Sequence, residues 1–329
     1  MKIFFLEKSI SFNSYDINSD KIGGTEKTLI NISNELAKNP KLEVKVFNEI
    51  HIKKKINNVE WSNINEYNNK IIPDVLIAFS DINLFKNYKS HKKFLWSHSV
   101  QNFEKFVRKK QLFAYLKHRP IFILEGDYHY KNRSFFTSFY GKKIIKLAPD
   151  YDFIEEKINI DDIPPKNCIF TSKSDRNLDI LLKAWNKIHL SNTDAKLFIN
   201  PPYEINDDLN KQNVILRKKG DKKNLIKDLK YSRCMLIPGH KGEVFCLAAE
   251  EARELCIPIV TLGYGSLYER VIHNKTGFIA KNLDEFIDYA HKLLNDKSLY
   301  LEFRKNLFNL RNSRNFSHVA QDLIKIIEI

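Results

Sequence analysis

Several features that would place the chain in a special class are scarce or missing. Glycine and proline number only ten each in 329 residues, and 43% of the residues are hydrophobic. This composition excludes a collagen-like or disordered chain and predicts a packed globular protein. No stretch approaches the roughly 18 consecutive apolar residues that a membrane-spanning helix needs. The apolar run within 1–7 is too short for a signal peptide, so we expect it to form a buried first strand and the protein to be cytoplasmic.

Cysteine is also scarce. The four cysteines lack the spacing of metal ligands, and three of them lie in apolar runs: Cys168, Cys234, Cys246 and Cys256. This pattern is typical of reduced thiols in the core of a cytosolic protein and predicts no metal site at these residues.

Acidic residues are outnumbered by basic ones, 40 to 54, which gives a net charge of +14. Such a charge is typical of proteins that bind nucleic acid or an anionic membrane. Lys, Asn, Ile, Phe and Tyr are abundant together, however, and all have AT-rich codons, so drift in base composition explains the charge equally well. We find no RNP-type aromatic motif, paired Cys/His finger or basic region with heptads, and we therefore do not expect a nucleic-acid partner.

Short apolar runs alternate with helical patterns along most of the chain, as in βαβ units with parallel sheets. The predicted strands of the first half are 2–6, 44–47, 74–78, 93–96, 121–124 and 143–147, with a helix at 26–37. Those of the second half are 168–171, 195–200, 214–217, 235–238 and 259–262, with helices at 178–188, 224–232 and 245–255. The polar segment 48–69 carries no pattern that assigns it, and helical patterns dominate from 283 onward.

An acidic, proline-bounded stretch at 149–165 interrupts the alternation and predicts a domain boundary. We therefore predict an α/β domain at 1–160, a second at 161–312, and a C-terminal segment at 313–329. Open α/β sheets bind ligands at the carboxyl ends of their strands, so two such domains in succession predict a ligand cleft between them.

The most informative segment runs from Gly239 to Ala252, where a predicted strand leads through a polar loop into a helix. Backbone N–H groups at the start of that helix, in Phe245, Cys246 and Leu247, together with the helix dipole, predict a phosphate site. Glu243 lies in the loop. Glu251 flanks an apolar row of the helix, where its carboxylate needs a polar partner; either ribose hydroxyls or an ion pair with a neighbouring residue would meet that need. Its neighbour Glu250 is expected to be solvated.

Glu243 and Glu251 are separated by seven residues, and the segment 243–280 resembles the E-x7-E signature of the GT-B glycosyltransferases of family 4. The resemblance implies two Rossmann-like α/β domains with the donor, a nucleoside diphosphate sugar, bound in the cleft between them. It places Glu243 near the donor sugar and Glu251 at the ribose. Cys246 departs from the pattern, since many members have glycine there and glycine permits a closer approach to phosphate.

Two further segments agree with the resemblance. Gly23 and Gly24 precede a predicted helix and resemble the family's glycine loop beside the donor phosphates, although a Gly-Gly pair is also common in plain turns. Arg176 stands where many members have lysine against the diphosphate and could contact two of its oxygens. The family's other basic position is Thr171 here, so either Lys173 replaces it or that contact is lost.

His98 ends a predicted strand and matches a family position close to the sugar and the leaving group. A lone histidine at a strand end also has structural roles, so both interpretations stay open. The C-terminal segment 315–320 resembles the family's last helix, which crosses back onto the first domain.

The stretch 103–119 contains six basic residues and one acid among apolar ones, and includes Lys105, Arg108 and Lys109. A basic amphipathic helix predicts a surface for the acceptor or for anionic lipids, with a helix that packs on its own domain as the alternative.

The reaction that the resemblance implies is transfer of a sugar to a glycan or lipid-linked acceptor with retained configuration, in cell-surface polysaccharide synthesis. Helix N-termini and a guanidinium can stabilise the departing diphosphate without a metal or other cofactor. The string Asp150–Tyr151–Asp152 leaves a metal-dependent alternative open, and the departures at Cys246 and Thr171 leave open a non-catalytic basic binding protein on the same scaffold.

Overall fold

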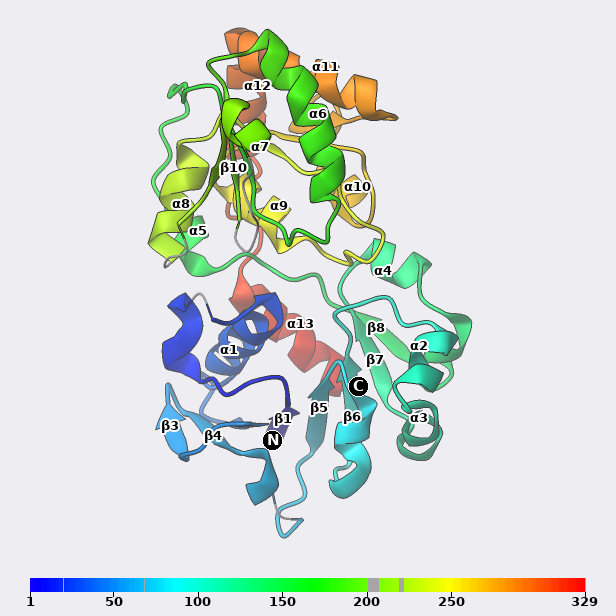
Figure 1. Cartoon of the computed structure of the whole chain (residues 1–329). Helices are drawn as coiled ribbons and strands as arrows, with labels where there is room; N and C mark the ends of the chain where they lie inside the picture. Colours follow the sequence, from blue (N-terminus) through cyan, green and yellow to red (C-terminus); the bar gives the residue numbers. More distant parts are fainter. Residues whose placement is uncertain (20, 68, 201–206, 219–221, 329) are drawn as a thin grey trace. The chain divides into compact units, whose positions relative to one another are not determined.

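The computed structural model describes residues 1–19, 21–67, 69–200, 207–218 and 222–328. These form two compact units (Figure 1). Unit 1 comprises Met1–Leu147 and the residues from Phe316 onward, and unit 2 is Ala148–Asn315. No helix in the described ranges is long and apolar enough to cross a membrane.

Unit 1 is built on a sheet whose described strands follow the order β3-β4-β2-β1-β5-β6-β7-β8. The strands are β1 (Lys2–Leu6), β2 (Glu43–Asn48), β3 (Lys54–Ile56), β4 (Val59–Asn63), β5 (Val75–Phe79), β6 (Lys92–Trp96), β7 (Ile121–Leu124) and β8 (Lys142–Ile144). All neighbours pair in parallel except β3 with β4. Five predicted strands are confirmed, and the sixth ends early, at Ile144.

The sequence did not predict β3 and β4, which lie inside the unassigned segment 48–69. They form a hairpin whose turn residues Asn57 and Asn58 both have positive φ, 51° and 63°. An Asn-Asn turn between two short runs is a hairpin signal, but β3 exposes its lysines and has little apolar alternation.

Helices surround this sheet. They are α1 (Gly24–Leu36), α2 (Phe103–Arg108), α3 (Leu112–His118), α4 (Asp127–Lys131) and α13 (Phe316–Glu328), with 3-10 turns at Ser14–Asn18, Ile64–Glu66, Ile82–Asn87 and Phe135–Ser138. The last helix, α13, packs against α1, so the end of the chain is part of unit 1.

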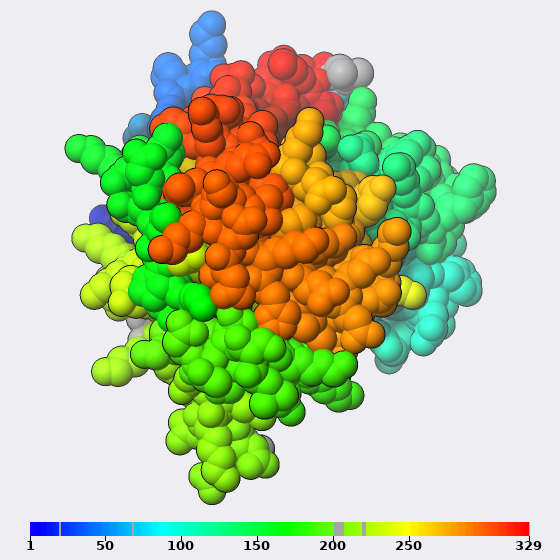
Figure 2. All heavy atoms as spheres, turned by 90° about the horizontal axis from the view of Figure 1, so that it is seen from above, coloured from blue at the N-terminus to red at the C-terminus, as the bar shows by residue number. Residues whose placement is uncertain are grey.

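Unit 2 has a parallel sheet whose described strands follow the order β11-β10-β9-β12-β13-β14. The strands are β9 (Asn167–Phe170), β10 (Lys196–Ile199), β11 (Val214–Leu216), β12 (Cys234–Leu236), β13 (Ile259–Thr261) and β14 (Gly277–Ile279). The helices are α5 (Tyr151–Ile154), α6 (Leu178–Ser191), α7 (Asp207–Lys211), α8 (Lys222–Lys230), α9 (Leu247–Glu254), α10 (Leu267–Arg270), α11 (Leu283–Asn295) and α12 (Lys297–Phe308). On the face of unit 2 seen in Figure 2, α11 and α12 (orange) lie next to each other, and α11 packs against α6 (green).

The stretch 149–165, which predicted the boundary, belongs to unit 2. Phe153 of α5 is buried in the core of that unit, and Lys222 pairs with Asp150 and Asp152. The chain therefore passes from unit 1 to unit 2 between Leu147 and Ala148, earlier than the predicted 160/161.

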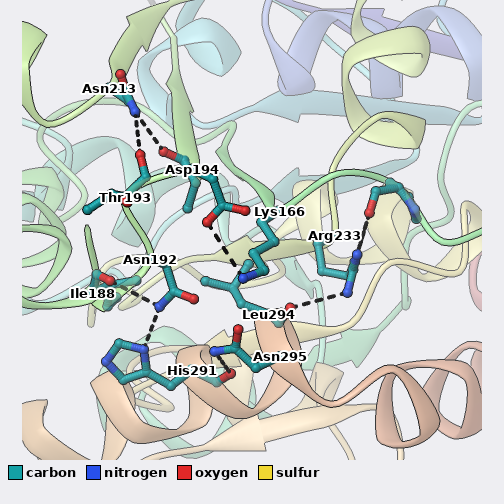
Figure 3. Close-up of polar contacts among 12 residues, drawn as sticks. Lys166, Ile188, Asn192, Thr193, Asp194, Asn213, Arg233, His291, Leu294 and Asn295 are labelled. Carbon is teal, nitrogen blue, oxygen red and sulfur yellow. Dashed lines mark hydrogen bonds and ion pairs between the residues drawn. The ribbon is translucent and has the colours of Figure 1, made fainter. Parts of the chain in front are cut away.

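At the amino-terminal edge of the unit 2 sheet, polar side chains bond to the backbone at helix and strand ends (Figure 3). The Asn192 amide donates to the Ile188 carbonyl at 3.1 Å and contacts His291 Nδ1 at 2.8 Å. Asn213 Nδ2 donates to Thr193, and the Arg233 guanidinium donates to the carbonyls of Pro164 and Leu294. These bonds give partners to carbonyls at the ends of helices and strands, several of them buried.

The strand order reverses between β9 and β12 in unit 2, and between β1 and β5 in unit 1. The loops after β9 and β12 therefore begin at such a reversal, where open α/β sheets bind their ligands.

Candidate active site

In unit 2 the loops that follow β9 and β12 are bonded to each other. Asn177 Nδ2 donates to the Gly239 carbonyl at 2.6 Å, and Arg176 Nη1 lies 3.0 Å from His240 Nδ1. These contacts bring Arg176, which the sequence predicted, beside the loop that carries Glu243.

His240, which no sequence pattern had pointed to, also belongs to this loop. The Gly242 N–H donates to its Nδ1 at 3.0 Å, so Nδ1 acts as an acceptor and can also accept from Arg176. With Nδ1 as acceptor, the neutral ring carries its proton on Nε2. The only sequence feature that marks His240 is its place in a strand–loop–helix segment. Histidines at such places are too common for that feature to identify a site.

The carboxyl group of Glu243 lies in a partly desolvated place. Burial raises its pKa, while Cys246, Arg176, His240 and Ser172 act in the opposite direction. Its Oε2 is buried and has no hydrogen-bond partner among the described residues. An orphaned buried acceptor of this kind is available to a ligand that donates hydrogen bonds.

Glycines shape this loop. Gly265 has φ +71°, and a Cβ there would lie 2.3 Å from the carbonyl oxygen of His240. The Ser266 N–H donates to the Glu243 carbonyl at 2.9 Å, which fixes the backbone of the loop. A side chain at position 265 would therefore displace the segment that holds Glu243.

The helix after the loop begins at Leu247, two residues later than predicted, and Cys246 is its N-cap with φ +61°. Cys246 thus adopts the left-handed conformation that favours glycine, and the backbone follows the path a glycine would take. Phe245 and Cys246 are buried before the helix, while Leu247 and the residue after it contribute the N–H groups that begin a helix without an intrahelical acceptor. Burial and the nearby Glu243 raise the pKa of the Cys246 thiol.

The expectation that Glu250 is solvated was wrong. Only 4% of Glu250 is exposed, and its carboxylate pairs with Arg253 and, at 3.2 Å, with Arg270. Arg270 Nε donates to the Phe245 carbonyl at 2.8 Å, and its guanidinium lies 4.1 Å from the centre of the Phe245 ring. The pair thereby ties α10 to the start of α9, while Glu251, the next residue, is partly exposed.

Lys173 of unit 2 was also predicted to contact the diphosphate of the donor sugar nucleotide. It is exposed in the loop after β9, and its carbonyl accepts from the Arg176 N–H at 2.9 Å, so both residues lie in one turn.

In unit 1, His98 follows β6, and its ring stacks on Phe79 with the ring centres 5.1 Å apart. Its Nδ1 pairs with Oε1 of Glu125, a residue that no sequence pattern predicted. The other ring nitrogen, Nε2, is buried without a hydrogen-bond partner in the described part of the chain.

Gly23 and Gly24 begin α1, as the N-cap and the first helical residue. The Gly23 N–H donates to Glu26 Oε2 at 2.9 Å, so this amide is already occupied. Any phosphate contact in this loop would therefore use the amides that follow Gly23.

The basic stretch 103–119 forms two short helices, α2 and α3, and not one amphipathic helix. The chain turns at Lys110, which has φ +52°. Lys105 points inward, because its Nζ donates to Ser99 Oγ at 2.6 Å, and burial with Lys109 and Arg108 nearby lowers its pKa. Arg108 and Lys109 are exposed, which both the binding surface and a helix packed on its own domain predict.

Asp150 and Asp152 are engaged by a buried lysine. Lys222 Nζ lies 2.9 Å from Asp150 Oδ2 and 2.7 Å from Asp152 Oδ2. A cation at these carboxylates would have to displace Lys222. Within the described ranges, no group of three or more His, Cys, Asp or Glu side chains is placed to hold a metal ion.

Comparison with known proteins bears first on the unit that holds Arg176 and Glu243. Residues 171–309 match the family model of the glycosyl transferases group 1. Among curated proteins, none matches the sequence significantly.

Solved structures that the chain resembles show that it has the GT-B fold. The chain resembles sucrose-phosphate synthase from Thermosynechococcus elongatus (TM-score 0.72, 11% identity, 99% of this chain and 98% of that one). It also resembles HepE of Anabaena in complex with UDP and glucose (TM-score 0.70, 13% identity, 100% and 99%). TarM of S. aureus in complex with fondaparinux, α-GlcNAc-glycerol and UDP is similar at a TM-score of 0.63 and 16% identity; the match covers 78% of this chain and only 55% of TarM.

Proposed function

We propose that the chain is a retaining, metal-independent glycosyltransferase of the family 4 type that moves a sugar from a nucleoside diphosphate sugar to a glycan or lipid-linked acceptor. One observation carries the proposal. Arg176, His240 and Glu243 lie together at the start of α9, inside the segment that matches the glycosyl transferases group 1. We further propose that the reaction serves cell-surface polysaccharide synthesis.

The donor chemistry follows from these groups. As the bond between sugar and diphosphate breaks, negative charge grows on the diphosphate and positive character grows on the sugar. The Arg176 guanidinium and the N–H groups at the start of α9 would stabilise the diphosphate, and the buried Glu243 Oε2 would accept from a sugar hydroxyl. Glu251 would accept from the ribose. We propose front-side attack by the acceptor, assisted by the leaving phosphate.

A thermal-shift screen of UDP, GDP, ADP and their sugar conjugates tests the proposal. A ligand at about 100 times its Kd stabilises a protein by about 2.7 kcal/mol, so the matching nucleotide should raise Tm by several degrees. Nucleoside monophosphates serve as the control, because they lack the second phosphate. A chain that none of the diphosphates stabilises would contradict the proposal.

Metal independence has its own test. Because Lys222 already pairs with both Asp150 and Asp152, and protein groups such as Arg176 would supply the positive charge at the diphosphate, transfer should continue in EDTA. Loss of transfer on chelation, restored by Mn²⁺ or Mg²⁺, would overturn this part of the proposal.

The rival function is a basic binding protein that keeps the scaffold without catalysis. The cysteine at position 246 does not favour this rival function. The backbone of Cys246 adopts the left-handed conformation that glycine would adopt, so the path of the loop is kept. Incubation with radiolabelled sugar nucleotides separates the two functions, because only the enzyme releases or transfers the labelled sugar.

We also propose that unit 1 docks on an anionic membrane. Six apolar side chains near α2, α3 and the turn at Phe135–Ser138 are 49–81% exposed: Phe103, Val107, Phe113, Leu116, Phe135 and Phe139. Exposed Arg108 and Lys109 lie on the same segments. Exposed aromatic rings with cations beside them suit the interface of a bilayer that contains acidic lipids.

Sedimentation with vesicles of phosphatidylcholine, with and without phosphatidylglycerol, tests the docking surface. Arg108→Glu with Lys109→Glu should reduce binding to the anionic vesicles at least tenfold, from about 1 kcal/mol lost per cation. Lys297→Glu with Lys305→Glu, two exposed lysines of α12, is the matched control. Equal binding by both double variants would remove this surface.

A further inference from the structure

Unit 1 contains a buried carboxylate for which the donor chemistry above has no use. Glu125 comes directly after β7, only 2% of it is exposed, and it pairs with His98, which follows β6. The two strands are neighbours, with Trp96 opposite Ile123, so the register of the sheet places the two side chains at the same edge. Burial of a carboxylate is costly unless a specific partner compensates it.

The pairing determines which nitrogen of the neutral His98 ring carries the proton. Nδ1 faces Oε1 of Glu125, a buried oxygen that accepts no aligned hydrogen bond in the described part of the chain, and a lone pair on Nδ1 would be repelled by it, so we place the proton on Nδ1. Nε2 is then a bare acceptor, and it is buried without a partner among the described residues.

Two other titratable side chains, His129 and Lys105, lie near the His98–Glu125 pair. His129 is 1% exposed and accepts the Glu125 backbone N–H on its Nδ1 at 3.2 Å. Burial lowers the pKa of His129 to about 4, so it is neutral near pH 7. The nearby cation Lys105 is bonded to Ser99 Oγ.

We propose that Glu125 is a positioning residue that fixes His98 as the Nδ1–H tautomer, so that Nε2 accepts a hydrogen bond from a sugar hydroxyl. The hydroxyl rests on the proposed function, whereas the tautomer rests on the geometry alone. In this tautomer His98 cannot donate a hydrogen bond to an oxygen of the leaving phosphate, because Nε2 carries no proton.

Nitrogen-15 NMR of the histidine rings tests the tautomer without any substrate. In the unchanged protein, His98 should show a protonated Nδ1 and a bare Nε2 near pH 7.5, and Glu125→Gln should mix or invert the two forms, because an amide can both donate and accept. Glu7→Gln, which alters another buried carboxyl of unit 1, should leave the His98 signals unchanged. A proton on Nε2 in the unchanged protein, or identical His98 signals in Glu125→Gln, would overturn the inference.

Kinetics supply the second readout. Glu125→Gln should lower kcat about 10- to 100-fold with little change in the KM for the donor, less than the roughly 10⁴-fold that a wrong tautomer costs a histidine acting as a general base. Glu125→Asp, which keeps the charge, should recover part of the rate. If the unchanged protein transfers no sugar, the proposed function fails while the tautomer result stands; if transfer is intact in Glu125→Gln, the positioning role fails alone.

Discussion

The two units place polar groups at the carboxyl ends of their strands in different ways. In unit 2, Arg176, His240 and Glu243 lie on two loops that bond to each other beside the start of a helix. In unit 1, His98 and Glu125 form a buried pair against an aromatic ring, and one ring nitrogen is left without a partner. The Arg176 guanidinium and backbone amides together are suited to bind an anion. The His98 imidazole, held in one orientation by Glu125, is suited to form a single hydrogen bond at the reacting centre. We infer that substitutions in unit 2 act on donor binding and substitutions at His98 act on the chemical step.

The largest expected effect concerns the framework of the donor site. Glu250→Ala removes the 3.2 Å partner of the largely buried Arg270 side chain and leaves it only the 3.9 Å contact with Glu269, and we expect unit 2 to lose about 3–5 kcal/mol of unfolding free energy. Urea unfolding can be followed by the fluorescence of Trp185, which is buried in unit 2, after Trp61 and Trp96 of unit 1 are replaced by phenylalanine.

Glu250→Leu combined with Arg270→Leu should cost less than the two single changes added together, because no charge is left unpaired. Strictly additive losses would show that the pair does not stabilise α9.

The next effect concerns chemistry in unit 1. His98→Ala should lower kcat by about 10²–10³, equal to ~2.7–4 kcal/mol, while the affinity for nucleotide changes little. His98→Asn should restore part of the rate, since its amide can accept a hydrogen bond as Nε2 does. If His98→Ala lowered Tm and left kcat intact, His98 would have a structural role. The proposed difference between donor binding in unit 2 and chemistry in unit 1 would then be contradicted.

Donor binding in unit 2 should respond somewhat less. Arg176→Ala and Glu251→Ala should each weaken the binding of the nucleoside diphosphate by about 1.5–3 kcal/mol, the range for hydrogen bonds that involve a charged group. Isothermal titration of each variant measures the loss, and Lys187→Ala, an exposed cation on α6, is the control. Binding that is unchanged in Arg176→Ala would remove the donor site from this loop.

The smallest effect is a gain in stability. Burial raises the pKa of Glu243, so the folded chain holds this proton more tightly than the unfolded chain does. The ionised carboxylate therefore costs stability above the raised pKa, and the cost disappears as the pH falls below the ordinary value of 4.5. Glu243→Gln should stabilise unit 2 at pH 7 by about 1 kcal/mol, the scale of a buried group without a partner, and lose that gain near pH 4. A Tm difference that does not change with pH would contradict this assignment.

The two units also differ in how far the sequence predicts them. Arg176, Glu243 and Glu251 lie on short segments that carry a recognisable spacing, and the strand–loop–helix pattern predicted their setting. His98 could be named only by resemblance, and Glu125 could not be named at all, because the pairing of β6 with β7 brings together residues that no local pattern connects. Glu250 was misplaced because the helical period gave its direction but not the presence of Arg270 on α10.

Steady-state release of nucleoside diphosphate from the matching sugar nucleotide, with water as the acceptor, tests the division between the units most directly. The account predicts that Arg176→Ala raises the KM for the donor with a smaller change in kcat, and that His98→Ala lowers kcat with KM nearly unchanged. If both variants changed the same parameter by the same factor, the division between donor binding in unit 2 and chemistry in unit 1 would be contradicted.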